Sequence, residues 1–350
     1  TGVTVSPRPI PEDLLPWALA ELGSVPGEGE APLTVVAGDA SNRRYFRLTL
    51  AQASYVLVEA PPETEKNTEF LAVRAQLEQG GLRVPALYAA DLDRGYLALE
   101  DLGDRLLLAE LNADTVDECY LQAFGSLLKL AQTQAPSPQW PAYDEALLGE
   151  ELSRFPQWFA QSLLDYSLTD ADRVLFERLS KLLIDSALVQ PRVLVHRDFH
   201  SRNLMPQDDG TLGVIDFQDA VMGPISYDLA SLLKDCYIRW PREQVRGWAL
   251  EYRGLLLANK LLSDVSEEEF LRWFDWMGLQ RHIKVLGTFA RLYLRDDKPE
   301  YLRDLPLVLR YVLEVLEQYS AEEPVFAEFC QWFQQNLSPL IRAQSWSASL

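Results

Sequence analysis

The sequence predicts an α+β fold made of two unequal lobes. The chain has 350 residues, 48% of them apolar, which is enough to build two ordered cores. Residues 33–100 contain mostly the short apolar or alternating runs of β-strands, whereas residues 101–350 contain mostly the longer apolar periodicity of helices. We therefore expect a small N-terminal lobe with a β-sheet, residues 1–100, and a larger, mainly α-helical C-terminal lobe, residues 101–350.

The N-terminal lobe is expected to hold five strands and one helix. The strands are expected at residues 33–37, 44–50, 54–59, 86–90 and 96–100. The helix, residues 68–79, has apolar residues on one face and ends at Gly80-Gly81, a common stop. A small sheet carrying one helix is typical of a lobe that covers a nucleotide. A further short helix, residues 11–22, lies in a Pro- and Gly-rich segment to which we assign no function.

The C-terminal lobe is expected to be built from helices around a short strand frame. Helices with apolar stripes are expected at residues 106–111, 116–133, 147–164, 171–188, 227–237, 242–262, 267–294 and 302–319. Strands are expected at 191–195, 204–205 and 212–215, the last two joined by a hairpin turn at Asp208-Asp209-Gly210. This frame places a short loop, residues 196–203, between two strands.

The loop carries a motif typical of phosphoryl transfer, His196-Arg197-Asp198-Phe199-His200-Ser201-Arg202-Asn203, followed by Ile215-Asp216-Phe217. Asp198 is the candidate catalytic residue, placed to accept the proton of a substrate hydroxyl. Asn203 and Asp216 are the candidate magnesium ligands, because the loop turns Asn203 back toward the metal that Asp216 reaches from a neighbouring strand. A surface loop with a capping Asp would use similar residues, but the surrounding strand frame favours the phosphoryl-transfer interpretation.

Candidate nucleotide contacts lie at two other places. Gly38-Asp39-Ala40-Ser41-Asn42 falls between the first two strands, where backbone amides, the Ser41 hydroxyl or the Asn42 amide would cover phosphates. An ordinary hairpin turn would use the same residues. Glu100-Asp101-Leu102-Gly103 falls where the lobes join, and its backbone, at Glu100 and Leu102, is the candidate adenine contact. A polar turn that opens a helix is compatible with that role.

The expected third strand lacks the Lys that usually contacts the α- and β-phosphates and pairs with a helix Glu. Glu69 is a candidate for the helix carboxylate. The missing positive charge must come from another residue, and each candidate would equally suit a solvated surface: Arg43, Arg44, Arg47 or Lys66.

Two of the three His residues stand in the loop. His196 and His200 flank Asp198, but a third ligand at a suitable spacing for a transition metal is lacking, and carboxylate, amide and phosphate oxygens favour Mg²⁺. We expect His196 to brace the loop by hydrogen bonding. Asp228, at the start of an expected helix, is a structural residue that caps the helix or accepts hydrogen bonds from the loop.

Composition disfavours several other classes of protein. A net charge of −20, from 52 acidic and 32 basic residues, disfavours nucleic acid and anionic membranes as partners. The three Cys residues lie far apart, which disfavours a disulfide framework or a zinc site. No apolar stretch has the length of a membrane span and no signal peptide is evident. We expect a soluble cytoplasmic protein, and its oligomeric state stays open.

These motifs, together with Phe217-Gln218-Asp219-Ala220 and Gly223-Pro224-Ile225-Ser226-Tyr227-Asp228-Leu229-Ala230, resemble the aminoglycoside phosphotransferase-like small-molecule kinases over about residues 33–290. The segments 38–47 and 60–62 make the chain most similar to the bacterial anomeric kinases of N-acetylmuramate and N-acetylglucosamine used in cell-wall recycling. The resemblance implies a bilobal protein-kinase-like fold, ATP and Mg²⁺ as cofactors, and phosphorylation of the sugar at its C1 hydroxyl. The absence of an Ala-Pro-Glu segment after Asp216 disfavours protein kinases.

The acceptor is expected to contact residues of the loop and of the helices that follow it. The candidates are Arg197, His200, Arg202, Asp235 and Trp240, with Arg197 or Arg202 facing a lactyl carboxylate. A kinase for a cationic acceptor, such as an aminoglycoside or choline, would instead need an acidic pocket around Asp198. A nucleotide-binding pseudokinase is suggested by the missing Lys, although the intact Asp198, Asn203 and Asp216 speak against it.

Overall fold

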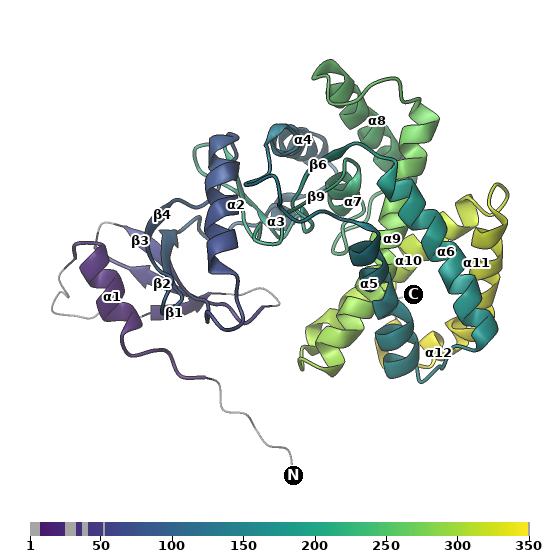
Figure 1. Cartoon of the computed structure of the whole chain (residues 1–350), viewed down its shortest axis with the longest axis horizontal. Coiled ribbons are helices and arrows are strands. Elements are labelled where there is room, and N and C mark those ends of the chain that lie inside the picture. Colours follow the sequence, from purple (N-terminus) through teal and green to yellow (C-terminus); the bar gives the residue numbers. More distant parts are fainter. Residues whose placement is uncertain (1–7, 25–32, 37–40, 52, 349–350) are drawn as a thin grey trace, which may run out of the picture.

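The computed structural model describes residues 8–24, 33–36, 41–51 and 53–348. Figure 1 shows a sheet with two helices on one side of the molecule and a larger group of helices on the other. The α+β fold with two lobes is confirmed. We propose that the lobes divide after residue 100, where the last strand of the N-terminal sheet ends.

The N-terminal lobe is a five-stranded antiparallel sheet in the order β1-β2-β3-β5-β4. The strands are β1 Leu33–Val36, β2 Arg44–Thr49, β3 Ser54–Glu59, β4 Leu87–Asp91 and β5 Tyr96–Glu100. Phe46 and Leu57 are register partners on one face, which packs on helix α1, Leu14–Glu21. Side chains alternate along a strand, so Tyr45 and Val58 lie on the opposite face, toward helix α2, Asn67–Gln79, and the second lobe. The sheet thus has an outer face and an inner face.

The C-terminal lobe packs around one long helix, α9, Glu267–Leu294, which is buried over most of its length (Figure 1). The other helices are α3 Leu107–Glu110, α4 Val116–Gln132, α5 Glu145–Arg154, α6 Asp170–Leu188, α7 Tyr227–Leu233, α8 Arg242–Ala258, α10 Leu305–Gln318, α11 Pro324–Asn336 and α12 Ser338–Arg342, with a π-helix at Phe155–Leu163 and 3₁₀ turns at Pro299–Asp304 and Ser345–Ser347. In the described part of the chain, no helix combines the length and apolar character needed to cross a bilayer.

The strand frame differs from the expected one by one added strand. Strand β7, Leu204–Pro206, pairs with β8, Leu212–Val214, as the turn between them predicts, but β6, Arg192–Val195, pairs with β9, Val221–Pro224. Strand β9 and helices α11 and α12 were not predicted. The expected helix at 147–164 is α5 followed by the π-helix. The loop 196–203 still runs from β6 to β7, between the two small sheets.

A close approach of α9 to the end of α5 requires a glycine. A Cβ atom on Gly287 would lie 2.3 Å from the carbonyl carbon and 2.4 Å from the carbonyl oxygen of Arg154. The glycine therefore lets α9 contact the chain where α5 continues into the π-helix. This contact also aligns Lys284 of α9 with Glu151 of α5, one helical turn earlier on each element.

We predict that Gly287→Ala destabilises the protein by about 1–3 kcal/mol, because the backbone of Arg154 must move to admit the methyl group. Chemical denaturation measures the change. Gly254→Ala is the matched control: it lies within α8, is exposed and has open space around it, so it should be neutral or stabilising by up to about 1 kcal/mol. Equal effects of the two substitutions would contradict the assigned role of Gly287.

Candidate active site

The loop 196–203 is held in place by two buried carboxylates. Asp228 of α7 accepts hydrogen bonds from the backbone N–H of His196 (2.8 Å) and of Arg197 (3.0 Å). Asp235, just after α7, accepts from the backbone N–H of Ser201 (2.9 Å) and from its hydroxyl. Asp228 thus has the second of its two expected structural roles, that of a buried acceptor for the loop.

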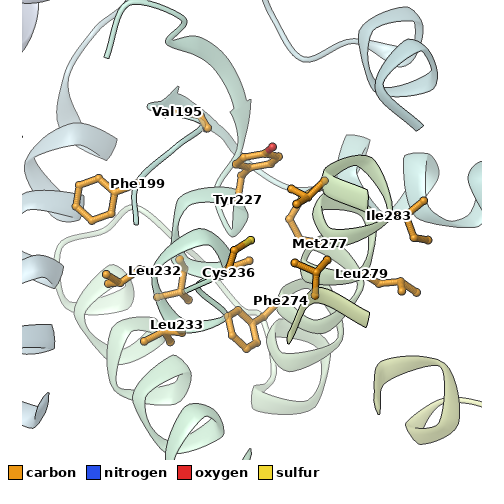
Figure 2. Close-up of a cluster of buried hydrophobic side chains, with 14 of the residues drawn as sticks. Val195, Phe199, Tyr227, Leu232, Leu233, Cys236, Phe274, Met277, Leu279 and Ile283 are labelled. Atoms are coloured by element: carbon orange, nitrogen blue, oxygen red, sulfur yellow. The ribbon is translucent and has the colours of Figure 1, made fainter. Parts of the chain in front are cut away.

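Helix α7 is itself wholly buried between the loop and α9. Figure 2 shows Phe199 of the loop on one side of Leu232 and Leu233, and Phe274 and Met277 of α9 on the other. Because apolar packing fixes α7 on both sides, the two carboxylates cannot move without disturbing the core. The loop therefore sits on a rigid support.

His196 braces the loop, as expected. Its Nδ1 accepts the backbone N–H of Asp198 at 3.0 Å, and its Nε2 lies 2.8 Å from the carbonyl oxygen of Ile215. An acceptor Nδ1 requires the proton to be on Nε2, which then donates to Ile215. The ring thus ties Asp198 to the segment that carries Asp216.

The three residues expected to act on the triphosphate lie together. Asn203 donates its Nδ2 to the carbonyl of Asp198 (2.9 Å) and lies 3.3 Å from Oδ2 of Asp216. Because the Asn203 nitrogen makes these contacts, its side-chain oxygen is left to bind a metal. An amide oxygen from Asn203 and a carboxylate oxygen from Asp216 are ligands that suit Mg²⁺, whose other ligands are usually water and phosphate. Among the described residues, no group of three or more His, Cys, Asp or Glu side chains is placed to hold a metal ion.

The Asp198 carboxylate is ionised and open to a ligand. Its side chain is 42% exposed. Enclosure by the protein favours the neutral acid, but the positive charges of Lys284 and Arg281 outweigh it and hold the pKa of Asp198 well below its ordinary value. The residue can therefore accept a proton from an acceptor hydroxyl throughout the neutral pH range.

Two residues of the site have a backbone conformation that favours glycine. Arg197 has φ +85° and Asp216 has φ +59°. Such conformations cost about 1–3 kcal/mol each and persist only where the surroundings determine them. For Arg197 the surroundings are a carboxylate, Glu151 (2.6 Å), and the hydroxyl and ring of Tyr143 (3.0 Å to the oxygen).

Glu151 binds Arg197 at 2.6 Å, and the expected contact of Arg197 with the substrate stays a prediction. The Glu151 side chain is buried and also pairs with Lys284 at 3.0 Å, while Lys284 donates to the hydroxyl of Tyr227. Burial alone would raise the pKa of Glu151, but Lys284 and Arg197 lower it to about 2. One carboxylate between two cations leaves net positive charge beside Asp198.

Arg281 adds a third positive charge, with its Nη2 3.8 Å from Oδ1 of Asp198. Neither Arg281 nor Lys284 was predicted from the sequence. A signal was present, because charged residues interrupt an otherwise apolar stretch of the expected helix 267–294. Only the fold shows that this face of α9 meets the loop.

Two other expected acceptor contacts, Asp235 and Trp240, form hydrogen bonds within the fold. Asp235 has no exposed surface and its carboxylate is occupied by Ser201 and by the backbone N–H of Tyr237, so its prediction as a substrate ligand was wrong. Trp240 donates its indole N–H to the hydroxyl of Tyr120 at 2.9 Å and packs edge-on against that ring. The indole N–H is therefore not free for a substrate.

His200 and Arg202 remain available on the acceptor side. Both lie against the ring of Tyr237, His200 edge-on at 5.3 Å and the Arg202 guanidinium over its face at 4.7 Å. Burial lowers the pKa of His200 to about 4, so its ring is neutral at pH 7. Arg202 is exposed and forms no ion pair with any described residue, so it keeps a free positive charge.

The expected nucleotide contacts are partly engaged in the fold. Gly38 lies outside the described residues. The Ser41 hydroxyl accepts the backbone N–H of Arg43 at 3.1 Å, and the backbone N–H of Asn42 donates to Glu65 at 3.0 Å.

At the junction of the lobes, the Glu100 side chain forms a two-pronged ion pair with Arg83 (2.6 and 2.7 Å). The carbonyl of Leu102 accepts the Gln207 side-chain amide at 3.0 Å. The Glu100 backbone N–H also donates to the Ala86 carbonyl, at 2.8 Å. Two backbone groups of the junction are thus engaged within the fold, and an adenine contact through its other backbone groups stays a prediction.

The sheet separates the cations that were candidates for the missing Lys. Arg44 is the register partner of Glu59 on the outer face and pairs with it at 2.5 Å, so it points away from the second lobe. Arg47 lies on the inner face but is bound to Asp101 at 2.6 Å. Lys66 is exposed.

Arg43 is the candidate that best fits the role of the missing Lys, because it lies on the inner face of the sheet. Its side chain is 4% exposed and pairs at 3.2 Å with Glu65, which precedes α2. The carboxylate expected to pair with this cation was Glu69, but Glu69 is exposed. The Arg43 guanidinium lies over the ring of Phe70, and this ring stacks on Phe217, the residue after Asp216. Arg43 is thus linked through two rings to the metal side of the site.

Comparisons with known proteins agree with this geometry. The model of the phosphotransferase enzyme family matches residues 32–264. The chain is 44% identical to the N-acetylmuramate/N-acetylglucosamine kinase of Pseudomonas putida, over 82% of this chain and 85% of that protein. It is 40% identical to the protein of the same name from Pseudomonas aeruginosa, over 89% of this chain and 91% of that protein.

Solved structures show the same fold at low identity. An ethanolamine kinase from Plasmodium vivax superposes with a TM-score of 0.60 at 13% identity, over 80% of this chain and 82% of that chain. The ADP-bound aminoglycoside phosphotransferase APH(2'')-Ib superposes with a TM-score of 0.58 at 15% identity, over 87% of this chain and 99% of that chain. The predicted protein-kinase-like fold is confirmed, and at these identities the likeness concerns the fold alone.

We predict that Glu151→Gln destabilises the protein by about 3–5 kcal/mol at pH 7, because Arg197 and Lys284 lose their shared counter-charge. The stabilisation by Glu151 is complete above its ordinary pKa of 4.5 and is lost as the pH falls toward about 2. The difference in unfolding free energy between wild type and variant should therefore shrink from pH 7 to pH 3, as urea titrations at both pH values would measure.

The neighbouring Glu150→Gln is the matched control. Glu150 is 55% exposed and pairs with Arg154 at the surface, so its loss should cost less than about 1 kcal/mol. A difference for Glu151→Gln that stays constant between the two pH values would contradict the assigned ion pairs.

Proposed function

We infer that this chain, which belongs to the phosphotransferase enzyme family, is an ATP-dependent sugar kinase that phosphorylates the anomeric C1 hydroxyl of N-acetylmuramate and N-acetylglucosamine. The observation that carries the proposal is the ionised, partly exposed Asp198 beside the Asn203–Asp216 pair. The names of the relatives support the choice of acceptor. We place the enzyme in the cytoplasm, in the recycling of cell-wall amino sugars.

The proposed reaction follows from the positions of the three side chains. Asp198 orients the C1 hydroxyl and takes its proton late, because a loose phosphoryl transition state needs little activation of the nucleophile. The C1 oxygen forms a bond to the γ-phosphorus while the bond to the bridging oxygen breaks, and that oxygen leaves with ADP. Asn203 and Asp216 would hold Mg²⁺, which supplies positive charge across the phosphates.

The charges around Asp198 support a neutral or anionic acceptor. Arg281 and Lys284 lie beside the carboxylate and Arg202 keeps a free charge. A cationic acceptor would meet repulsion here, which disfavours choline and aminoglycosides. We propose that Arg202 faces the lactyl carboxylate of N-acetylmuramate and that His200 lines the sugar site.

On the nucleotide side we propose that Arg43 replaces the missing Lys. Arg43 lies on the inner face of the sheet and forms an ion pair with Glu65, which precedes α2. Its Nε has no hydrogen-bond partner among the described residues. These are the properties of a cation held ready for phosphate oxygens.

An ADP-release assay over N-acetylmuramate, N-acetylglucosamine, choline and kanamycin tests the proposed function. We expect turnover with the two amino sugars and none with the two cations. Asp198→Asn should reduce turnover by about 10³-fold or more while ADP binds with nearly unchanged affinity, because the substitution removes the proton acceptor alone. Turnover with choline or kanamycin instead would support the alternative acceptors, and silence on all four would favour a pseudokinase.

Arg43→Met should raise KM for ATP by about 10- to 100-fold, the loss expected for a charge-assisted contact with phosphate. Arg44→Met, on the outer face of the same strand region, is the control and should change KM by less than about threefold. Steady-state kinetics at saturating sugar measures both. A larger effect of Arg44→Met would show that the faces of the sheet were assigned the wrong roles.

A further inference from the structure

Arg281 is a buried cation with few partners. Its side chain is 4% exposed, yet its Nη2 lies 3.8 Å from Oδ1 of Asp198, too far for a hydrogen bond. Its Nη1 donates a long hydrogen bond, 3.5 Å, to Sγ of Cys236. Its Nε has no hydrogen-bond partner among the described residues. A guanidinium has five N–H donors, so most of its capacity is unused.

The groups around Arg281 do not supply the missing anion. Burial raises the pKa of the Cys236 thiol to about 11, so the sulfur is uncharged at pH 7. Burial also keeps the adjacent His282 neutral by lowering its pKa. Glu151 is already shared by Arg197 and Lys284. The one carboxylate that pairs with Arg281 among the described residues is Asp198, at 3.8 Å and without a hydrogen bond. Because a buried cation with such a loose counter-charge is costly, its presence points to a further anion that arrives with the ligand.

The position of Arg281 indicates which anion this is. Asp198 must lie within hydrogen-bond distance of the attacking oxygen, and the phosphorus under attack is the next atom along. A donor 3.8 Å from the Asp198 carboxylate is therefore within reach of the oxygens on that phosphorus. The loop's own Arg197 is bound to Glu151 and is therefore already paired.

We propose that Arg281 is a further catalytic residue, which binds the phosphoryl group as it passes from ATP to the acceptor and retains it in the sugar 1-phosphate product. As the new bond from the C1 oxygen to phosphorus forms and the bond to the ADP oxygen breaks, Arg281 donates N–H bonds to the non-bridging oxygens. The proton of the hydroxyl goes to Asp198. This inference rests on the proposed kinase function and adds a residue to its mechanism.

Two other roles for Arg281 make different predictions. A contact with the lactyl carboxylate would matter for N-acetylmuramate and not for N-acetylglucosamine, which lacks that group. A purely structural role, orienting Asp198, would affect the binding of phosphorylated and unphosphorylated sugar equally. The two acceptors and the product therefore separate the three possibilities.

The experiment compares wild type, Arg281→Gln and Arg281→Lys. For Arg281→Gln we expect kcat to fall about 10²- to 10³-fold with both acceptors, with Arg281→Lys intermediate because it keeps the charge but loses the planar fork. In calorimetric titrations, Arg281→Gln should bind N-acetylglucosamine 1-phosphate at least about tenfold more weakly and N-acetylglucosamine with unchanged affinity. Arg272→Gln, on the exposed side of α9 and paired with Glu322, is the control and should change neither quantity.

Specific results would overturn the proposal. A defect confined to KM for N-acetylmuramate would assign Arg281 to the carboxylate, and equal loss of affinity for sugar and sugar phosphate would assign it a structural role. If the wild type phosphorylates neither sugar, the proposed sugar-kinase function is wrong, and this result alone does not decide the role of Arg281. Arg281 is then judged by the binding of ADP with aluminium fluoride, a mimic of the transferring phosphoryl group, and unchanged binding in Arg281→Gln would reject it.

Discussion

The site depends on the hydrogen bonds that Asp228 and Asp235 accept from the backbone and hydroxyl groups of the loop 196–203. Burial raises the pKa of Asp228 to about 6, so its charge is costly to keep, and the two loop N–H groups partly offset that cost. Because these hydrogen bonds hold the loop at both of its ends, the loop has a fixed path from β6 to β7. The positive φ of Arg197, the brace through His196 and the aim of Asp198 all follow from this anchoring.

A second constraint is local charge. The protein carries a net charge of −20, yet cations lie beside the Asp198 carboxylate: Arg197 and Lys284 share Glu151, and Arg281 lies 3.8 Å from Asp198 itself. Net charge acts at long range and is screened over about 10 Å in salt, whereas these residues are in contact. The acidic surface is therefore compatible with an acceptor site for neutral or anionic sugars.

The sequence was sufficient for the features that depend on local pattern. The strands β1 to β5, helix α2 and the path of the catalytic loop follow from alternation, helix stops and the spacing of Asp198, Asn203 and Asp216. Features that depend on tertiary pairing were missed. Strand β9 has no local strand pattern strong enough to predict it, Lys284 meets Glu151 only because α9 lies against α5, and Arg281 meets Asp198 only because α9 lies against the loop. Residue type misled for Asp235, because a polar residue that suits a sugar also suits a buried structural contact.

The position of the phosphate on the product tests the central claim most directly, namely that Asp198 serves an anomeric hydroxyl. The measurement is a phosphorus–proton correlation NMR spectrum of the product made from ATP and N-acetylglucosamine. The account predicts that the phosphorus couples to H1 of the sugar. Coupling to H6 or to another ring proton, or the absence of any phosphorylated sugar, would contradict it.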